Sequence, residues 1–395
     1  MSEWKDVTIG DYIDLISGFA FKSSNFLDEQ VENSLPVVKI KNVANGDTNL
    51  NDVVFHMYDN SLEKYLLKKD DVLIAMTGNH PQALSQVVGG VSKYKLDTHS
   101  LLNQRVGKII AKENTCLDFV YYLFKDKDVQ NYLANQSSGS ANQANISKKD
   151  ILELNLKIPS PTLQRTIAGI LSSLDDKIDL LNRQNQTLES MAEALFRHYF
   201  IDNAQPDWKD GKLDKEFYFL MGQSPSGESF NEENIGIPMY QGNTDFGFRF
   251  PNNRVFTTEP KRFAEKFDTL ISVRAPVGAQ NMADEKCCIG RGVASFRYKE
   301  EKSFYSYTYY KMMSLMEEIK QFNESGTVFG SISKSDFENI SIIIPDAESI
   351  ICFQKNVKPI DDKIYNNQTQ INTLSNLRNT LLPKLMNGEV YMEIT

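Results

Sequence analysis

The side chains that most often perform chemistry in enzymes are present in this chain, but their spacing matches no catalytic pattern. The sequence has no phosphate-binding GxxxxGK loop ending in Ser or Thr, no zinc-binding HExxH and no GxSxG nucleophile motif. None of the four histidines pairs with a cysteine at metal-ligand spacing. We therefore expect a chain that is not an enzyme by itself.

Two short segments contain enzyme-like residues without the context that their chemistry needs. Asn79–Gln82 (Asn-His-Pro-Gln) resembles the Asn-Pro-Pro-Tyr loop of adenine methyltransferases. It lacks the aromatic residue that would stack on a flipped base. Asp207 and Asp210 have nuclease-like surroundings, but they lie close together in a linker, where no sheet could bring the carboxylates to one metal ion. We interpret both segments as chance matches.

Composition limits the remaining possibilities. The 395 residues allow two or three domains with cores of their own, and the hydrophobic content of 41% and charged content of 24% are ordinary for globular proteins. No apolar run is long enough for a membrane span, the first residues lack a signal-peptide pattern, and the four cysteines show no CxxC spacing. We expect a cytoplasmic protein with reduced thiols. The net charge of −9 argues against unspecific adhesion to nucleic acid but leaves room for local basic loops.

The chain repeats itself with a long period. Asp175–Ile178 and Asp361–Ile364 are both Asp-Asp-Lys-Ile and lie 186 residues apart. The same offset relates Ile146-Ser-Lys to Ile332-Ser-Lys, and it also relates Pro159 to Pro345. Solenoid repeats are about 20–50 residues long, so this period indicates a tandem duplication of one large unit.

Each copy begins with a mixed pattern dominated by short strands. In the first copy, apolar runs at 35–40, 72–76 and 106–110 are separated by turn residues and followed by a helical pattern at 117–133. The second copy repeats this order, with the aromatic-rich segment 304–319 in the place of the helix. We expect an α+β fold in which each mixed domain has a twisted, largely antiparallel sheet with short helices.

A long helix with one apolar seam follows each mixed domain. One heptad position repeats apolar residues over nearly five heptads in the first helix, and the second helix has the equivalent set. The two helices are expected to pack against each other, antiparallel, so that the chain has pseudo-two-fold symmetry. The residues predicted to pack are Ile167, Leu174, Leu181, Leu188 and Leu195 in the first helix and Phe353, Ile360, Ile364, Leu374 and Leu381 in the second.

Each seam contains one asparagine, and a proline interrupts the second helix. Asn185 and Asn367 each occupy one seam position, where a buried asparagine fixes the helix register at a cost in stability. A second interpretation places both on the solvent side of a skipped position. Pro359 either occupies the first turn of the second helix or kinks it near residue 355.

This layout resembles the specificity subunits of type I restriction–modification systems. Ser17–Ser24 (Ser-Gly-Phe-Ala-Phe-Lys-Ser-Ser) is similar to the opening motif of their target recognition domains, and Asp268–Gly278 is similar to an Asp-x-Leu-x-Ser-x-Arg element. Leu381–Gly388 is similar to the usual C-terminal end. The first copy departs from the second element, because it has Thr77 where the second copy has Arg274.

The resemblance implies both the domain boundaries of the chain and the role of each domain. Target recognition domains at 1–157 and 204–345 would each read half of a bipartite site in double-stranded DNA, while helical regions at 158–203 and 346–395 would set the spacer. Two methyltransferase subunits and two restriction subunits would dock on the chain. S-adenosylmethionine, ATP and magnesium would act in these partners, with no cofactor or metal in this chain and no membrane association.

Side chains with paired donors and acceptors are the ones that read bases in a groove, and both mixed domains have them near glycine-flanked loops. The candidates in the first domain are Lys22, Lys39, Lys41, Asn42, Asn79, Arg105, Asn142 and Gln143. Those in the second are Gln241, Asn243, Arg249, Arg254, Arg274 and Arg291. Lys148 and Lys334 occur in the repeated Ile-Ser-Lys, and we expect both to contact phosphates, because a residue shared by two readers cannot distinguish their half-sites.

A second class of function remains open at this point. A coiled-coil scaffold whose mixed domains bind other proteins, without DNA specificity, would also fit the acidic net charge and the lack of a concentrated basic stripe. Neighbouring genes for a methyltransferase and a helicase–nuclease would favour the DNA reader over the scaffold.

The helical regions lead to a prediction about spacing. Insertion of one heptad at matching points in both helices preserves the seam and adds about 10 Å at ~1.5 Å per residue. That length corresponds to about three base pairs at ~3.4 Å each. The gap between half-sites should grow by about one to three base pairs, with weaker binding and unchanged half-sites. Methylome sequencing would reveal the new gap, whereas a changed half-site with an unchanged gap would contradict the spacer role.

Overall fold

The computed structural model describes residues 4–43, 47–79, 88–136, 138–140, 143–323 and 330–390. The chain divides into two compact units. Unit 1 consists of residues 1–179 and 372–395, and unit 2 consists of residues 180–371. Each unit therefore combines one mixed domain with a stretch of both long helices. No helix among the described residues is long and apolar enough to cross a membrane.

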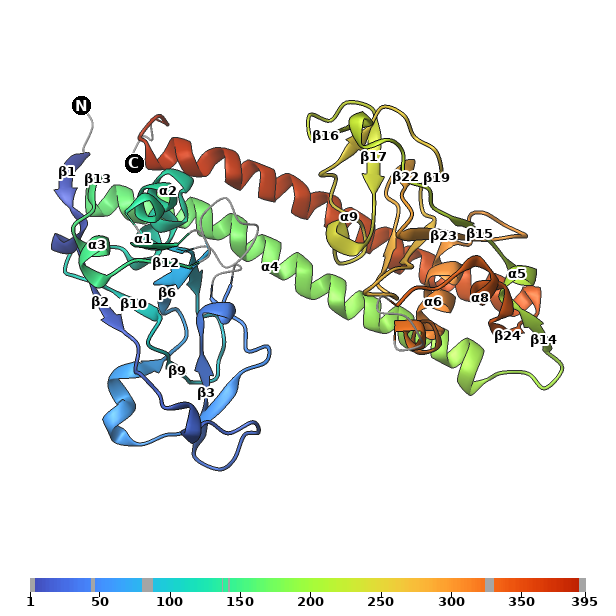
Figure 1. Ribbon diagram of the computed structural model, residues 1–395, viewed down its shortest axis with the longest axis horizontal. Coiled ribbons are helices and arrows are strands. Elements are labelled where there is room, and N and C mark those ends of the chain that lie inside the picture. The colour runs from blue at the N-terminus through green and yellow to red at the C-terminus, as the bar shows by residue number, and fades with distance from the viewer. Residues whose placement is uncertain are drawn as a thin grey trace. The chain divides into compact units, whose positions relative to one another are not determined.

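The two long helices are α4 (Pro161–Arg197) and α9 (Ala347–Met386) (Figure 1). In unit 2, Asn367 contacts Asn185 and Asn356 contacts Tyr199, so residue numbers rise along α4 as they fall along α9. In unit 1, α4 and α9 pack within one hydrophobic core that contains Ile167 and Leu385. The helices are antiparallel, as predicted.

Burial divides the predicted packing residues into two groups. The fully buried ones are Ile167, Leu181, Phe353 and Ile364. The half-buried ones are Leu174, Leu188, Leu195, Ile360, Leu374 and Leu381. The neighbouring heptad position is buried more continuously, at Leu171, Ile178, Asn185 and Ala192 on α4 and at Val357, Ile364, Ile371 and Leu385 on α9. This second position forms the centre of the seam.

The residues that interrupt the seam have defined places. Asn185 and Asn367 are each 1% exposed, and Nδ2 of Asn367 donates a hydrogen bond of 2.9 Å to Oδ1 of Asn185. The solvent-facing alternative is therefore wrong. Pro359 lies well inside α9, so its placement in the first turn is also wrong.

The described residues of unit 1 form four small sheets, in which all strand pairings except that of β3 with β9 are antiparallel. The strand orders, with bounds, are β1 (Lys5–Thr8)–β13 (Asn155–Ile158), β2 (Ile13–Ser17)–β10 (Val106–Ala111)–β6 (Val72–Ala75)–β8 (Val91–Lys93), β4 (Val54–Met57)–β3 (Ser34–Val38)–β9 (Ser100–Leu102)–β5 (Leu66–Leu67), and β11 (Ser138–Ser140)–β12 (Gln143–Asn145)–β7 (Thr77–Gly78). The short helices are α1 (Leu117–Lys125), α2 (Lys127–Asn135) and α3 (Lys148–Leu152).

The described strands of unit 2 form three sheets that correspond to three of those in unit 1, with β16 as an additional strand and a single parallel pairing, between β17 and β22. The strand orders are β14 (Lys209–Lys212)–β24 (Ser341–Ile344), β15 (Phe217–Met221)–β23 (Val293–Tyr298)–β20 (Thr269–Ser272)–β21 (Gln280–Met282), and β16 (Phe230–Asn231)–β18 (Phe256–Thr257)–β17 (Ile237–Tyr240)–β22 (Cys287–Ile289)–β19 (Phe263–Ala264). The helices are α5 (Leu213–Glu216), α6 (Tyr305–Ser314), α7 (Met316–Lys320) and α8 (Lys334–Asn339).

The two mixed domains share hydrogen bonds as well as strand order, which confirms the predicted duplication. The repeated Ile-Ser-Lys begins α3 and α8, where Ser147 and Ser333 cap the helix in the same capping box with an aspartate. A further pair of equivalent glycines, Gly18 and Gly222, has no room for a side chain. A Cβ would lie 2.0 Å and 2.1 Å from the carbonyl oxygens of Asn103 and Gly290.

One prediction of helical structure needs correction. The pattern at 117–133 predicted a single helix, but the structure has α1 and α2 with a break at Asp126. Oδ1 of Asp126 accepts hydrogen bonds from the N–H groups of Asp128 (2.9 Å) and Val129 (3.4 Å) and so starts a new helix. Periodicity alone does not reveal such a cap, because both helices continue the same apolar face.

The buried asparagine pair leads to a prediction about stability. Nδ2 of Asn185 and Oδ1 of Asn367 have no hydrogen-bond partner in the described structure. Asn367→Leu leaves the Asn185 amide in an apolar seam without its partner, so it should lower the free energy of unfolding by about 1–3 kcal/mol. Asn185→Leu combined with Asn367→Leu should be at least as stable as the wild type. Denaturant unfolding of the three proteins tests this, and losses that simply add in the double variant would contradict it.

Candidate functional site

Two of the residues predicted to read bases, Arg274 and Arg291, line one cleft of about 490 Å³ in unit 2. Arg274 follows β20 and forms a backbone bridge with Ser331, and Arg291 lies in the turn between β22 and β23. Both side chains are exposed, and neither has an ion pair or side-chain hydrogen bond within the described residues. The apolar part of the lining consists of Met221, Val273, Ala275 and Ile332. We call this feature the arginine cleft.

The other exposed candidates of unit 2 already have partners within the unit. Gln241 accepts a hydrogen bond from the Ser224 hydroxyl at 2.7 Å. Arg254 pairs with Asp245 at 2.8 Å and with Glu232 at 3.3 Å. The half-buried Asn243 begins a short 3-10 turn. The side chains of Gln241 and Arg254 would have to exchange or share contacts in order to bind a base.

Arg249 does not fit its predicted role in base reading, because its side chain is 1% exposed. Its guanidinium pairs with Glu189 of α4 and Asp361 of α9, both at 3.0 Å. It also donates to the Tyr310 hydroxyl at 2.7 Å and stacks over the Tyr309 ring at 3.9 Å. Arg249 therefore joins the mixed domain of unit 2 to both helices, and its function is structural.

In unit 1 the candidates separate into surface cations and framework residues. Lys22, Lys41 and Arg105 are exposed. The ammonium group of Lys39 lies 4.3 Å from the centre of the Phe26 ring. Asn42 is 1% exposed, and its amide accepts from Lys39 N–H and donates to the Asn51 carbonyl, both at 3.0 Å. The prediction that Asn42 reads a base is therefore wrong.

The remaining DNA-binding candidates of unit 1 are Asn79, Asn142 and Gln143. Asn79 is half-buried and directly follows β7. Asn142 lies outside the described residues, as does the side chain of Gln143. The carbonyl of Asn79 accepts a hydrogen bond from the N–H of Val88 at 3.0 Å.

The two lysines of the repeated Ile-Ser-Lys are on the surface, and each has an acidic neighbour. Lys148 lies 2.6 Å from Asp14, and Lys334 lies 3.2 Å from Glu338 one turn further along α8. Both pairs are largely solvated, and exposed pairs of this kind contribute about 0–1 kcal/mol. A phosphate group could replace the carboxylate at little cost.

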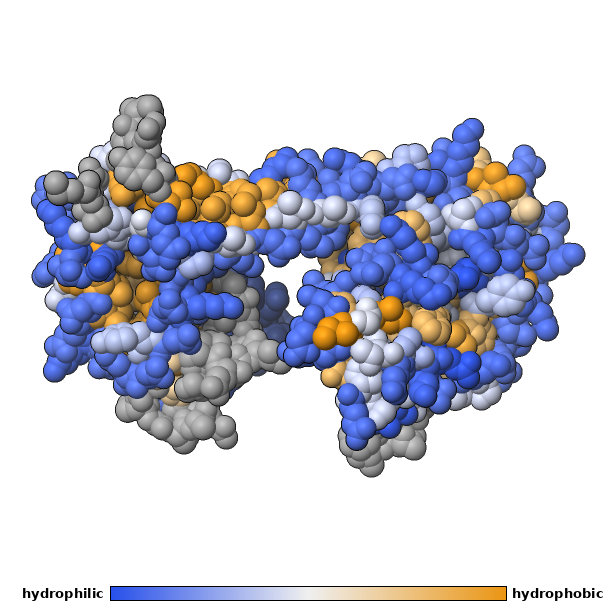
Figure 2. All heavy atoms as spheres, turned by 90° about the horizontal axis from the view of Figure 1, so that it is seen from above, coloured by the Kyte–Doolittle hydropathy of each residue, from blue (hydrophilic) through white to orange (hydrophobic). Residues whose placement is uncertain are grey.

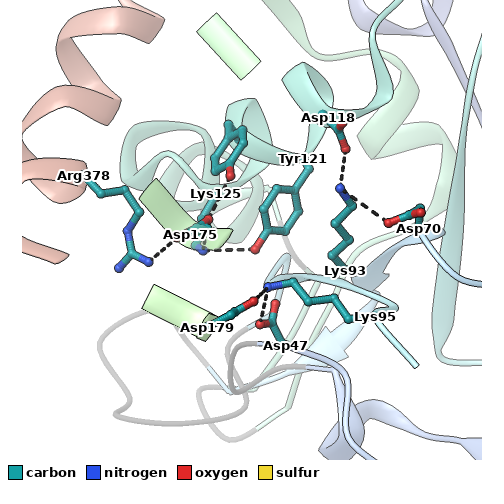
Figure 3. Close-up of polar contacts among 11 residues, drawn as sticks. Asp47, Asp70, Lys93, Lys95, Asp118, Tyr121, Lys125, Asp175, Asp179 and Arg378 are labelled. Carbon is teal, nitrogen blue, oxygen red and sulfur yellow. Dashed lines mark hydrogen bonds and ion pairs between the residues drawn. The ribbon is translucent and has the colours of Figure 1, made fainter. Parts of the chain in front are cut away.

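The repeated Asp-Asp-Lys-Ile places a carboxylate at the junction between helix and mixed domain in each unit. In unit 1, Asp175 accepts from the Tyr122 hydroxyl at 2.8 Å. It also accepts from Arg378 of α9 at 2.6 Å (Figure 3). The Lys125 ammonium lies over the Tyr121 ring at 5.0 Å and 3.9 Å from Asp175. In unit 2, Asp361 occupies the matching place and accepts from Tyr310 at 3.1 Å.

Lys95 adds a second link between the mixed domain of unit 1 and α4. Its ammonium pairs with Asp179 of α4 and with Asp47 of the mixed domain, the latter at 2.9 Å (Figure 3). Sequence reasoning did not select any member of this cluster as a site residue. The exact repetition of the tetrapeptide was the signal that could have identified Asp175 and Asp361.

The charges of both clusters are maintained by their neighbours. Burial by itself raises the pKa of Asp175, but Lys125, Arg378 and the Tyr122 hydroxyl outweigh it and hold the pKa below its ordinary value. Burial lowers the pKa of Arg249, but Asp361 and Glu189 outweigh it, so the guanidinium stays charged. Burial raises the pKa of Glu189 in spite of the adjacent Arg249.

Some apolar surface remains on the helices. Figure 2 shows hydrophobic surface over the helical segment at the left of the view. The exposed apolar residues that unit 1 contributes from α4 and α9 include Ile170 and Leu377, which are 37% and 45% exposed. A helix that already packs one seam and still exposes apolar residues is suited to contact with another protein.

The family of the type I restriction modification DNA specificity domain matches residues 1–190 and 207–381, one match for each mixed domain with part of a helix. The chain belongs to this family. Its relatives include a putative type I restriction enzyme MjaX specificity subunit of Methanocaldococcus jannaschii, which is 28% identical over 90% of this chain and 87% of that protein. The HindI specificity subunit of Haemophilus influenzae is 24% identical, with 99% of this chain and all of that protein covered.

A solved structure supports the fold of this family member. The S subunit of a type I restriction–modification system from M. genitalium matches with a TM-score of 0.62 at 19% identity, covering all of this chain and 97% of that one. Among the described residues, no three His, Cys, Asp or Glu side chains are grouped as metal ligands.

The contrast between Arg249 and Arg274 can be tested directly. Arg249→Met leaves two carboxylates buried without their cation, so it should lower the free energy of unfolding by about 3–5 kcal/mol. Arg274→Ala removes an exposed side chain that has no partner within the described part of the chain, so it should change the free energy of unfolding by less than about 0.5 kcal/mol. Urea unfolding of both variants beside the wild type measures the difference. Equal stabilities would contradict the structural role of Arg249.

Proposed function

We propose that this chain is the DNA specificity subunit of a type I restriction–modification enzyme. Each mixed domain would read one half of a bipartite, asymmetric site in double-stranded DNA. Family membership supports this function, and so does the presence of two mixed domains with one topology. The chain would act on DNA in the cytoplasm.

The observation that carries the proposal is one framework with two different sets of surface side chains. Three sheets of unit 1 have counterparts of corresponding strand order in unit 2, including the parallel pairing, and β16 is an additional strand in unit 2. The cleft of unit 2 nevertheless contains two arginines, and Thr77 stands in place of Arg274 in unit 1. A shared framework can approach two half-sites in the same way, while the differing side chains read different bases.

The accessible candidates divide by chemistry. We propose base contacts for Arg274 and Arg291 in unit 2 and for Arg105 in unit 1, because these cations are exposed and guanidinium groups bind base edges through two donors. Lys22, Lys41, Lys148 and Lys334 are proposed phosphate contacts, since an ammonium group acts as a point charge. Such contacts would make binding weaken as salt rises.

Catalysis would belong to partner subunits. We propose that methyltransferase subunits and restriction subunits, two of each, dock on this chain, and that S-adenosylmethionine, ATP and magnesium act within them. The apolar residues exposed on the helices, such as Ile170 and Leu377, offer a surface for such docking. The antiparallel helix pair is the proposed spacer between the half-sites.

The scaffold interpretation is less favoured. A coiled-coil scaffold needs an apolar seam and docking surfaces, but it has no need of two arginines that face one cleft and have no counter-ion among the described residues. Like charges repel, so such a pair is retained at some cost unless a ligand rich in acceptors binds it.

A methylome experiment tests the proposed function. Cells that express the cognate methyltransferase subunit with this chain should methylate adenines in one bipartite motif, and cells that express either subunit alone should not. Calorimetry with the purified chain should detect neither S-adenosylmethionine nor ATP binding at micromolar concentration. An identical methylation motif without this chain would contradict the proposal.

A further inference from the structure

A β-turn occurs at the same place in both mixed domains, between β9 and β10 in unit 1 and between β22 and β23 in unit 2. The N–H of Val106 donates to the carbonyl of Asn103 at 2.9 Å, and the N–H of Val293 donates to the carbonyl of Gly290 at 3.0 Å. These bonds close four-residue turns with the same spacing. The first central residue is Gln104 in unit 1 and Arg291 in unit 2.

The backbone around the two turns is fixed by matching hydrogen bonds. The N–H of Met76 donates to the carbonyl of Arg105 at 3.0 Å, and the N–H of Val273 donates to that of Gly292 at 2.9 Å. On the other side, the N–H groups of Gly18 and Gly222 donate to Val106 and Val293 at 3.0 and 2.9 Å. The turns are therefore equivalent positions of one rigid framework.

The neighbouring strand presents a second equivalent position. In unit 1, Thr77 pairs with Asn145 across β7 and β12, and the Thr77 hydroxyl donates to Oδ1 of Asn145 at 2.6 Å. In unit 2, Arg274 forms the corresponding backbone bridge with Ser331. The arginine that lines the cleft of unit 2 thus has a short hydroxyl side chain as its counterpart in unit 1.

The side chains at the two turns are both exposed, but they differ in the hydrogen-bond donors and acceptors that they present to a base. Gln104 and Arg291 are both exposed, and within the described residues neither side chain makes a hydrogen bond or ion pair. A guanidinium presents two donors, which match O6 and N7 of guanine, whereas a glutamine amide presents one donor and one acceptor, which match N7 and N6 of adenine.

We propose that this turn position sets the base read in each half-site: guanine through Arg291, assisted by Arg274, in the half-site of unit 2, and adenine through Gln104 in the half-site of unit 1. The inference rests on the proposed function and assigns residues to it. Gln104 is a specificity residue that composition and motif searches do not distinguish from any other loop glutamine.

A base fits the arginine cleft better than a phosphate. The cleft is backed by Met221, Val273 and Ile332, and an apolar wall suits the face of a base or a thymine methyl group. In unit 1 the turn lies beside Phe19, which pairs with Asn103 and is 38% exposed.

Reciprocal substitution in the full-length chain, expressed with its methyltransferase subunit, tests the inference. Arg291→Gln should replace one G·C pair by A·T in one half of the methylated motif and leave the other half intact. Gln104→Arg should introduce a G·C pair in the opposite half. Lys215→Gln, an exposed site in unit 2 outside the cleft, is the matched control and should leave the motif unchanged.

Binding of the purified complex to short duplexes gives a second readout. Arg291→Gln should weaken binding to the original motif by about 5- to 150-fold, and the duplex with the A·T replacement should restore most of that loss. Unfolding midpoints equal to that of the wild type would show that both variants fold, as expected for exposed turn residues.

The outcomes separate the inference from the proposed function. If no methylated motif depends on the chain, the proposed function fails. If the motif depends on the chain but Arg291→Gln and Gln104→Arg both leave it unchanged, the inference fails alone. If Arg291→Gln weakens all sequences equally and flattens the salt dependence, Arg291 contacts a phosphate, and the inference is again overturned.

Discussion

One carboxylate forms the directional polar contact between each mixed domain and the helix pair, beside the hydrophobic core that they share. Asp175 in unit 1 and Asp361 in unit 2 occupy matching places in the repeat, and each accepts a hydrogen bond from a tyrosine on the mixed domain. The cation differs: a largely solvent-shielded Arg378 serves in unit 1, and a fully buried Arg249 serves in unit 2. A half-satisfied network of this kind would be worse than an apolar contact, so the partners depend on one another. This junction adds directional contacts to the apolar packing between each mixed domain and the helices.

Much of the fold was predictable because it follows from patterns that the backbone enforces. The heptad positions predicted the antiparallel helices, and the offset between Asp175 and Asp361 predicted the duplication before any contact was visible. The break at Asp126 was missed because a cap depends on one side-chain oxygen and leaves the apolar periodicity unchanged. The choice between a buried and an exposed Asn185 needed the structure, since both agree with the sequence pattern.

The candidate site was less predictable, because residue type does not determine exposure. Arg249 and Arg274 are both loop arginines in the sequence, yet one is the centre of a buried ion cluster and the other lines an open cleft. The side-chain amide of Asn42 forms its hydrogen bonds within its own loop, through both its oxygen and its nitrogen. Gln104 could be recognised only by matching hydrogen bonds between the units, because the insertions between equivalent strands hide the alignment in the sequence.

The β-turn that presents Gln104 and Arg291 has a consequence for how such a protein diversifies. Its backbone is held by neighbouring strands, so the exposed side chain can be exchanged without disturbing the fold, as for most surface positions. Glutamine codons become arginine codons by a single transition, CAA to CGA or CAG to CGG. A change of target base in one half-site therefore lies within reach of a single point mutation, and the framework of the other half-site is unaffected by it.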